Sequence, residues 1–423
     1  MPYRRRVVDD VLDLLFPSLA AIALEGAKGV GKTATATQRA ASVLDLSRDR
    51  LRAVVAADVE RVVDEPSPVL IDEWQLAPAV WDVVKRAVDA DATGGRFLLA
   101  GSAGVAPGAR IHSGAGRIVS LKMRPMSIHE RGLCEPTVSL RELLAGAVPP
   151  ISGRSPVTLA GYTDEILASG FPGIRDLPEL AREAQLDSYI ARVVSHELPD
   201  NGAVVRRPRA LRAWLAAYGA ATATDASYSK ILNAASAGED EKTARVTVDA
   251  YREHLTRVFL LDPIEAWTPV FNPLKRLTKA PKHHLVDPAI AARLVRVGKA
   301  GLLRGDGARV AGAAGPWLGA LFESLTAQSV RVYASAAGAE VGHLRTMESD
   351  REIDLIVEGG DRQVVAIEVK LAGAAADHDV RHLNWLHGQL GDRLADKVVV
   401  TTGERAYRRG DGVAVVPLAL LGP

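Results

Sequence analysis

A glycine-rich segment near the start of the chain has the residue types and the spacing of a phosphate-binding loop. The segment from Gly26 to Thr33 matches the pattern G-x-x-x-x-G-K-T in full. Glycines let the backbone amides turn inward around phosphate oxygens. Lys32 is placed to reach the β- and γ-phosphates of a nucleotide, and the Thr33 hydroxyl is placed to bind magnesium. We therefore predict that ATP and Mg²⁺ bind here, at Gly26, Ala27, Lys28, Gly29, Val30, Gly31, Lys32 and Thr33.

An apolar run farther along the chain ends in two acidic residues. Val69-Leu70-Ile71 predicts a buried strand, and Asp72 and Glu73 follow it directly. Ligands of open α/β sheets bind beyond the carboxyl ends of the strands, so Asp72 can reach the magnesium of a nucleotide at the loop. Glu73 is the natural general base for the water that attacks the γ-phosphate. The alternative for Glu73 is a solvated charge at a strand end.

The elements around these residues predict a parallel α/β sheet in residues 1–150. Residues 20–24 predict the strand before the loop, and residues 33–44 predict the helix after it, whose positive end would face the phosphates. Residues 97–100 predict another strand, which is followed by Ser102. Ser102 could sense the γ-phosphate or orient the water, and an ordinary turn serine is the alternative.

The N-terminal third of the chain resembles the AAA-type P-loop ATPase domain of a large prokaryotic family. This resemblance implies ATP hydrolysis and makes Ser102 the sensor position. It also implies that Arg117 touches the γ-phosphate, in its own subunit or across the interface of a homo-oligomer. A surface ion pair is the alternative for Arg117, and Arg110 is a rival for the role. The resemblance is carried by the loop, by Asp72-Glu73-Trp74-Gln75, Leu99-Ala100-Gly101-Ser102 and Gly116-Arg117, and by residues 124–130.

Residues 151–300 predict a helical module that follows a stretch rich in glycine, proline and serine. A short helical pattern at residues 228–235 precedes an amphipathic pattern over residues 248–258, and residues 259–261 then read as extended. This order predicts a winged-helix unit. Several of its side chains could contact DNA or RNA phosphates, although a solvated helix face is at least as good an interpretation. These are Arg206, Arg207, Arg209, Arg212, Lys242, Thr243, Arg245, Thr247 and Arg252.

The resemblance to the ATPase family continues beyond the first 150 residues. Residues 170–173 resemble the Gly-Tyr-Pro turn of that family, and residues 251–261 resemble its helix-plus-strand module. Lys279-Ala280-Pro281-Lys282 and Leu285-Val286-Asp287 resemble the segment that opens its C-terminal domain. The alternative for Asp287 is a helix N-cap before Pro288.

A second group of residues with possible chemistry lies in residues 301–423. Asp354 lies within a predicted strand at residues 353–357, while Glu368 and Lys370 end the next predicted strand. Residues two apart in a strand point to one face, and a hairpin would bring Asp354 beside them. The two carboxylates would then bind magnesium, and the lysine would orient or activate a water.

This pattern resembles the PD-(D/E)xK nuclease fold, the α/β fold of restriction endonucleases. Glu323, on the preceding predicted helix, matches the additional acidic residue of that fold and joins the predicted metal ligands. Ile353 stands where the name of the fold places proline. The alternative is a nuclease-like domain that only binds nucleic acid or protein, in which Glu368 and Lys370 form an ion pair.

Two functions are compatible with this order of domains. The first is an ATP-driven enzyme that acts on, or is regulated by, nucleic acid and has an active metal-dependent nuclease. The second is an ATP-dependent switch or scaffold, whose silent C-terminal domain binds DNA or a protein partner.

The bulk composition predicts a cytoplasmic protein without a membrane segment. The chain is 48% hydrophobic and 24% charged, and its formal net charge of +1 provides no overall attraction to nucleic acid. A single cysteine, Cys134, excludes an internal disulfide. Aspartates at positions 9, 10 and 13 interrupt the basic start, so we predict no export signal. No apolar run approaches the roughly 20 residues of a membrane helix.

Overall fold

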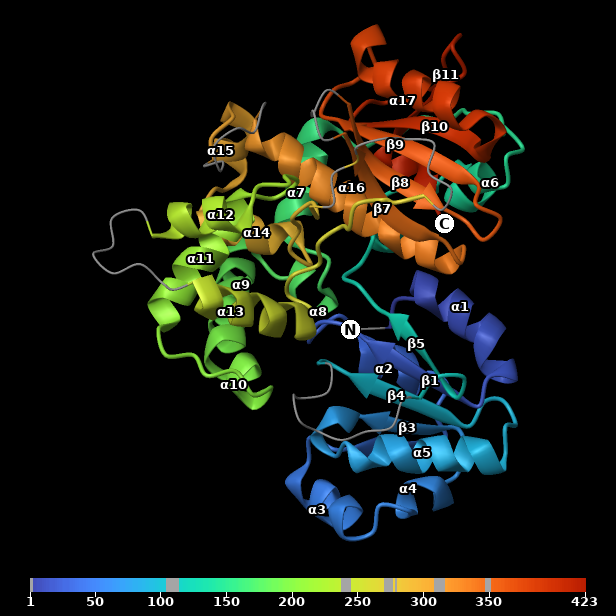
Figure 1. Ribbon diagram of the computed structural model, residues 1–423, viewed down its shortest axis with the longest axis vertical. Coiled ribbons are helices and arrows are strands. Elements are labelled where there is room, and N and C mark those ends of the chain that lie inside the picture. The colour runs from blue at the N-terminus through green and yellow to red at the C-terminus, as the bar shows by residue number, and fades with distance from the viewer. Residues whose placement is uncertain are drawn as a thin grey trace.

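The computed structural model describes residues 3–103, 114–236, 245–269, 277, 280–307, 316–346 and 351–423, with the backbone alone for residues 245–247. Figure 1 shows an α/β domain from the start of the chain at the bottom, a helical region at the left and a second α/β domain at the top. Within the described ranges, no helix is long and apolar enough to cross a membrane.

The N-terminal domain contains a parallel sheet with the strand order β2-β3-β4-β1-β5, which confirms the predicted α/β P-loop fold. Alternate residues of its central strands enter two different cores: Ile71 and Leu99 face one, while Leu70 and Leu98 face the other. Both faces are therefore buried, which explains the continuous apolar runs. The strands are β1 (Ala21–Glu25), β2 (Ser42–Asp45), β3 (Val69–Asp72), β4 (Phe97–Gly101) and β5 (Ile118–Lys122).

Helices cover both faces of this sheet. The helix after the loop ends at Thr37, although we predicted that it extends to residue 44. The Thr37 hydroxyl donates a hydrogen bond back to the Thr33 carbonyl at 2.7 Å, and Leu44 instead fills the core from strand β2. The helices are α1 (Val7–Leu15), α2 (Lys32–Thr37), α3 (Asp49–Ala57), α4 (Arg61–Asp64) and α5 (Ala79–Ala90).

The middle region is helical, as predicted. Two of its helices are followed by an extended segment that pairs antiparallel with a later one, at Leu261 with Leu285 and at Ile264 with Lys282. This order agrees with a winged-helix unit, and that identity stays a prediction. The helices are α7 (Leu159–Ala168), α8 (Pro172–Arg175), α9 (Glu179–Arg192), the π-helix Val193–Glu197, α10 (Leu198–Asp200), α11 (Pro208–Ala220), α12 (Tyr228–Ala235), α13 (Arg245–Arg257), α14 (Pro288–Val295) and α15 (Lys299–Arg304).

The C-terminal domain is a mixed sheet with the order β11-β12-β10-β9-β8-β7. The predicted hairpin is present, because β8 and β9 are antiparallel neighbours, and β9 continues through α17 to the parallel strand β10. Its elements are α16 (Trp317–Ala336), β7 (Glu340–Arg345), β8 (Glu352–Glu358), β9 (Val364–Lys370), α17 (Asp377–Leu390), β10 (Leu394–Thr401), β11 (Tyr407–Arg408) and β12 (Ala414–Pro417).

Residues 138–144, which lie before the predicted boundary near residue 150, pack against the C-terminal domain. Strand β6 (Val138–Ser139) pairs with β13 (Leu421–Gly422), and α6 (Leu140–Leu144) lies beside the C-terminal sheet in Figure 1. Leu143 shares a core with Ile367 and Val398 of that sheet. The apolar side chains of α6 are therefore buried far from the parallel sheet that precedes them in sequence.

A buried carboxylate joins the three regions. Asp262, in the segment after α13, accepts hydrogen bonds from Lys122 Nζ and Arg124 Nε, each at 2.7 Å, at the end of β5. Arg331 of α16 pairs with the same carboxylate at 3.1 Å. Burial alone would raise the pKa of Asp262, but these cations hold it well below its usual range. The joint is therefore a fully ionised, buried charge cluster.

His343 of β7 makes the stability of the fold depend on pH. Its Nε2 lies 2.9 Å from the Ala280 carbonyl, and its Nδ1 has no hydrogen-bond partner among the described residues. Burial, reinforced by nearby Lys282, lowers the pKa of His343 to about 4. The unfolded imidazole has a pKa of about 6.5, so the unfolded chain takes up this proton first and the stability falls as the pH drops from 6.5 to 4.

We expect His343→Gln to remove this pH dependence. Between pH 7 and pH 4, the wild type should lose about 3 kcal/mol more unfolding free energy than the variant. Urea titrations of both proteins at the two pH values measure this difference. Equal losses would show that the imidazole is not held neutral.

Candidate functional site

The residues predicted to bind and hydrolyse nucleotide meet at one edge of the parallel sheet. The loop follows β1, Asp72 ends β3, and Ser102 follows β4. The register pairs Glu25 with Gly101 and Asp72 with Ala100, so these strand ends are level. Parallel strands present their carboxyl ends at a common edge, and this edge is where ligands of such sheets bind.

Contacts within the protein hold the loop in its conformation. A Cβ atom at Gly26 would lie 2.1 Å from the Met123 carbonyl oxygen, and Gly31 has a φ of 107°, a conformation that favours glycine. Lys32 Nζ donates to the Gly26 carbonyl at 2.7 Å and to the Ala27 carbonyl at 3.0 Å. Burial lowers the pKa of Lys32 to about 8. Phosphate oxygens would offer this lysine stronger, charged acceptors than the two carbonyls.

Thr33 and Asp72 form the pair that could hold magnesium. Thr33 Oγ1 lies 3.0 Å from both carboxylate oxygens of Asp72. Burial, together with repulsion from Glu73, raises the pKa of Asp72 even though the Thr33 hydroxyl opposes the change. A divalent cation would relieve this cost. Mg²⁺ prefers oxygen ligands and usually takes one or two carboxylates together with substrate phosphates, so these residues fit the ion.

Glu73 lies in a polar network beside the magnesium pair. Its Oε2 accepts a hydrogen bond from Ser102 Oγ at 2.9 Å, and Gln75 donates to the same oxygen and to Ser102. Its backbone has a φ of 53° and a ψ of 41°, a left-handed conformation that is uncommon outside glycine. Such conformations gather at functional sites. Gln75 was part of the resemblance, but its contact with Glu73 follows only from the turn after β3.

A cavity of about 600 Å³ lies beside the loop. Tyr3 lines it from the N-terminal segment, Gly31 and Thr35 from the loop and α2, and Pro172 and Arg175 from α8. On another side of the loop, Lys28 Nζ pairs with Glu197 of the π-helix at 2.8 Å. Helices of the middle region therefore form part of the wall around the loop.

Arg6 ties the loop to the rest of the chain and was missed by the sequence analysis. Its guanidinium is buried and donates to the Val30 carbonyl at 2.9 Å and to the Arg124 carbonyl at 2.9 Å. It also pairs with Glu130 at 2.9 Å. The sequence around Arg6 shows only a basic N-terminal run, which contains no sign of a buried arginine.

The structure places Arg117 away from the nucleotide edge. Ile118, the next residue, pairs with Ala21 at the amino end of β1, so Arg117 lies at the opposite edge, about 15 Å of strand away. Its Nε donates to Asp89 Oδ1 at 2.7 Å, which is the surface ion pair weighed as the alternative. This position contradicts a γ-phosphate contact within the same subunit, and a contact across an interface stays a prediction. Arg110 lies outside the described residues.

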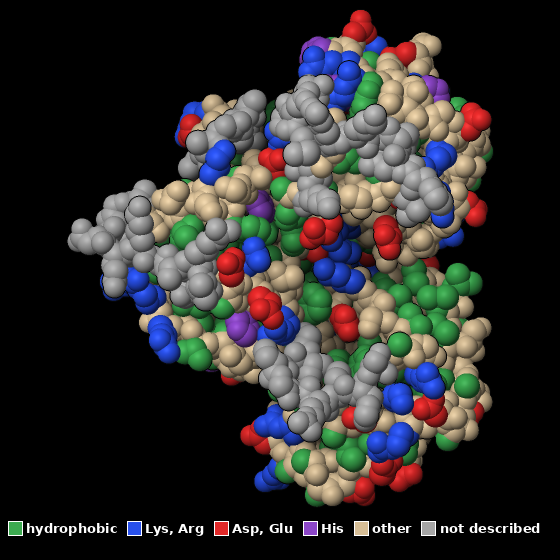
Figure 2. Space-filling model, in the orientation of Figure 1, with side chains coloured by type: hydrophobic (Ala, Val, Ile, Leu, Met, Phe, Trp, Pro, Cys, Tyr) green, Lys and Arg blue, Asp and Glu red, His purple; other side chains and the backbone are tan. Residues whose placement is uncertain are grey.

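The basic residues of the middle region are only partly described. Arg252 lies over the Tyr228 ring, 4.3 Å from its centroid, so part of its charge is engaged within the protein. The run Arg206, Arg207, Arg209 and Arg212 at the start of α11 is exposed, and Figure 2 shows Lys and Arg side chains at this side of the molecule. Nucleic-acid contact stays a prediction. Lys242, Thr243 and the side chains of Arg245 and Thr247, as well as Lys279, lie outside the described residues.

The residues of the predicted nuclease-like site do come together. The hairpin brings Asp354 beside Glu368, with which it shares a side-chain hydrogen bond, and Val369 N donates to Asp354 Oδ2 at 2.9 Å. Lys370 Nζ lies 3.5 Å from Glu368 Oε2. Burial and repulsion from Asp354 raise the pKa of Glu368 well above its usual range. Glu323 lies next to this cluster on α16, where it pairs with Lys282, and its role as a metal ligand stays a prediction.

A buried lysine occupies the centre of these carboxylates. Lys282 Nζ lies 2.9 Å from Glu323 Oε1, and 3.0 Å from both Asp354 Oδ1 and Glu352 Oε1. Burial alone would lower the pKa of Lys282, but attraction to these carboxylates raises it well above the usual value. The sequence analysis included Lys282 only within a family segment. Its spacing could not predict this contact, since Lys282 comes from the middle region.

The C-terminal cluster does not fit the predicted magnesium ion in this conformation. A divalent cation would have to share the carboxylates with the Lys282 ammonium, and like charges at such distances repel strongly. Among the described residues, no group of three or more His, Cys, Asp or Glu side chains is arranged to hold a metal.

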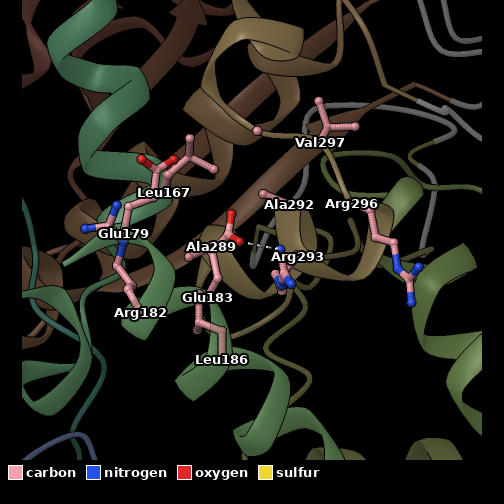
Figure 3. A pocket seen from close by; sticks show the side chains of 11 residues that line it. Leu167, Glu179, Arg182, Glu183, Leu186, Ala289, Ala292, Arg293, Arg296 and Val297 are labelled. Carbon is pink, nitrogen blue, oxygen red and sulfur yellow. Dashed lines mark ion pairs between the residues drawn. The ribbon is translucent and has the colours of Figure 1, made fainter. Parts of the chain in front are cut away.

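A smaller cavity, of about 130 Å³, lies between helices α9 and α14 of the middle region. Figure 3 shows Arg293 in an ion pair within this cavity, and Arg293 pairs with Glu183 at 3.2 Å and with Asp187 at 2.6 Å. These charges are balanced within the protein, so we assign no ligand to this cavity.

Comparison with known families agrees with the geometry of the nucleotide edge. Residues 19–132 match the family model described as AAA domain. This match and the geometry of the sheet edge together support an AAA-type P-loop ATPase. The matched range of the AAA domain includes the loop, the Asp72–Glu73 strand end and Ser102. Residues 160–301 and 318–421 match two models described as domains of unknown function, DUF8612 and DUF4143.

Curated relatives share more than the AAA domain. The uncharacterized proteins Rv2008c of Mycobacterium tuberculosis and Mb2031c of Mycobacterium bovis are each 25% identical over 354 residues, which is 82% of this chain and 68% of theirs. Among solved structures, the Walker-type ATPase PABY2304 of Pyrococcus abyssi is 15% identical, with a TM-score of 0.39, over 70% of this chain and 99% of that chain.

Proposed function

We propose that the protein binds ATP at the loop of residues 26–33, hydrolyses it, and uses this cycle as a switch between arrangements of its three regions. The observation that carries the proposal is the convergence of Lys32, the Thr33–Asp72 pair and Glu73 at one edge of the AAA domain. Those are the groups that a phosphoryl transfer to water needs: a phosphate ligand, a magnesium site and a base.

Each residue has a distinct task in the proposed reaction. Lys32 exchanges its two carbonyl acceptors for phosphate oxygens. Thr33 and Asp72 would hold Mg²⁺, which neutralises phosphate charge when bound. Glu73 accepts the proton of the attacking water, and Ser102 and Gln75 hold its carboxylate in place.

We place the nucleoside of ATP in the cavity of about 600 Å³ beside the loop. Gly31 and Thr35 connect this cavity to the phosphate-binding segment, and Tyr3 offers an aromatic ring and a hydroxyl. Arg175 lines the same cavity from α8. Binding there would bring the N-terminal segment, the loop and the middle region into contact with one ligand.

The switch is supported by direct contacts between the loop and the other regions. Lys28 reaches Glu197 of the middle region, and Arg6 bridges the Val30 and Arg124 carbonyls. The Arg124 side chain in turn binds Asp262 at the joint of the three regions. A rearrangement of the loop on nucleotide binding would therefore act on this joint.

The alternative function, an active metal-dependent nuclease, is less well supported. It needs a metal ion among Glu323, Asp354 and Glu368, where Lys282 lies instead. We therefore propose that the C-terminal domain is catalytically silent in this conformation and that it binds DNA, RNA or a protein partner. We also propose a homo-oligomer, in which Arg117 acts across the interface.

Lys32→Ala tests the proposed nucleotide site. We expect its Kd for ATP to rise roughly 10- to 100-fold, because a charged hydrogen bond to phosphate contributes about 1.5–3 kcal/mol. Titration with a fluorescent ATP analogue and Mg²⁺ measures this change. Lys85→Ala on α5 is the matched control, since Lys85 forms an exposed pair with Asp89 and should leave the Kd unchanged. Absence of saturable binding in the folded wild type would refute the proposal.

A further inference from the structure

The position predicted for the metal of the C-terminal domain is already taken by a side chain of the protein. The Lys282 ammonium contacts one oxygen each of Glu323, Glu352 and Asp354, at 2.9, 3.0 and 3.0 Å. We infer that Lys282 is the permanent internal cation of this cluster and that it keeps divalent metal ions out. This inference deepens the proposed switch, but it does not depend on the ATP site.

Carboxylates surround the lysine closely. Its ammonium donates hydrogen bonds to Glu323 Oε1 at 2.9 Å and to Asp354 Oδ1 at 3.0 Å, and it forms a further ion pair with Glu352 Oε1 at 3.0 Å. A divalent ion would bind these oxygens at about 2.0–2.6 Å, in the volume that Nζ occupies. The lysine and a metal ion therefore exclude each other, by space as well as by charge.

The backbone holds Lys282 firmly in place. Its amide donates to the Ile264 carbonyl at 2.8 Å, and its carbonyl accepts from the Ile264 amide at 2.9 Å. The next residue, His283, donates to the Thr224 carbonyl at 2.8 Å. The side chain is almost fully buried, with 2% of its surface exposed. Withdrawal of Lys282 would break this strand pairing, so we treat the lysine as a fixed part of the domain interface.

Ion pairs of Lys282 connect the middle region to the C-terminal domain. The middle region supplies the cation, while α16 and β8 of the C-terminal domain supply the carboxylates. Figure 2 shows acidic and basic side chains close together in the hollow where the domains meet. Removing either side would leave buried charge without a partner, which is far more costly than an exposed pair.

Lys282→Met tests the inference, because methionine keeps the length of the side chain and removes the charge. We expect the nucleotide-free variant to bind one more Mn²⁺ per chain than the wild type, counted by electron paramagnetic resonance. Adding Asp354→Asn should abolish the extra Mn²⁺. In wild type, Asp354→Asn alone should leave the bound Mn²⁺ unchanged. Oxygen ligands of this kind suit Mn²⁺ as well as Mg²⁺.

Three results would overturn the inference. One is a folded Lys282→Met variant, by circular dichroism, that gains no Mn²⁺. A second is a Mn²⁺ ion in the wild type that Asp354→Asn removes, and this measurement stands even when Lys282→Met does not fold. Metal-dependent DNA or RNA cleavage by wild type that Asp354→Ala and Lys370→Ala both abolish would equally contradict it. None of these measurements involves ATP, so they fail or succeed separately from the nucleotide titration.

Discussion

Glu73→Gln is expected to bind ATP as tightly as the wild type and to lose turnover, with kcat lower by roughly 10²- to 10⁴-fold. Glutamine keeps the size of the side chain, so the hydrogen bond from Ser102 Oγ at 2.9 Å can be retained. It cannot take a proton from the attacking water at neutral pH. The substitution therefore separates the chemistry from the binding, which depends on Lys32 and on the Thr33–Asp72 pair.

The measurement is a pair of assays on the same protein: phosphate release at saturating ATP for kcat, and titration with a fluorescent ATP analogue for Kd. Ser102→Ala and Gln75→Ala are informative companions, because each removes one donor to Glu73 and leaves the base itself. They should lower kcat less than Glu73→Gln does. If Glu73→Gln turns over ATP at the wild-type rate, another group is the base.

Asp262→Asn is expected to reduce the unfolding free energy by roughly 3–5 kcal/mol. The amide leaves the buried cations Arg124 and Arg331, and the half-buried Lys122, without their common counter-charge. Their desolvation is already evident, since burial lowers the pKa of Arg331 to about 10. Because these residues come from all three regions, the loss should appear in the separation of the domains as well as in unfolding.

Urea titration of wild type and variant at neutral pH measures the loss. Asp187→Asn is the control: Asp187 pairs with Arg293 on the surface, with 55% of its side chain exposed, and should cost below about 1 kcal/mol. Similar stabilities for Asp262→Asn and Asp187→Asn would mean that apolar packing alone holds the joint.

The sequence predicted those strands whose apolar residues end abruptly at polar or glycine-rich residues. The apolar runs before the loop and before Asp72 became β1 and β3. Weak patterns failed. Strand β2 is short and lies at the sheet edge with Val43 exposed, so its few residues looked like the end of a helix. Strand β7 is polar at its start, where Glu340 is exposed, and was also missed.

Residue order alone was enough to predict the nucleotide site, because a phosphate-binding loop is a contiguous segment. Eight neighbouring residues supply the turn, the lysine and the hydroxyl, and the strand that ends in Asp72 and Glu73 needs only a parallel neighbour to reach them. The spacing of residues along the chain is enough to predict a site when the residues of that site lie within one turn or at one strand end.

The contacts of Arg117, Asp262 and Lys282 became known only from the folded chain. Strand direction placed Arg117 at the wrong end of β5 for a γ-phosphate in its own subunit. Asp262 and Lys282 act on partners that are far away in sequence, and both belong to an antiparallel pairing that spacing did not predict. Charges pair through space, so the order and register of strands determine which carboxylate meets which cation.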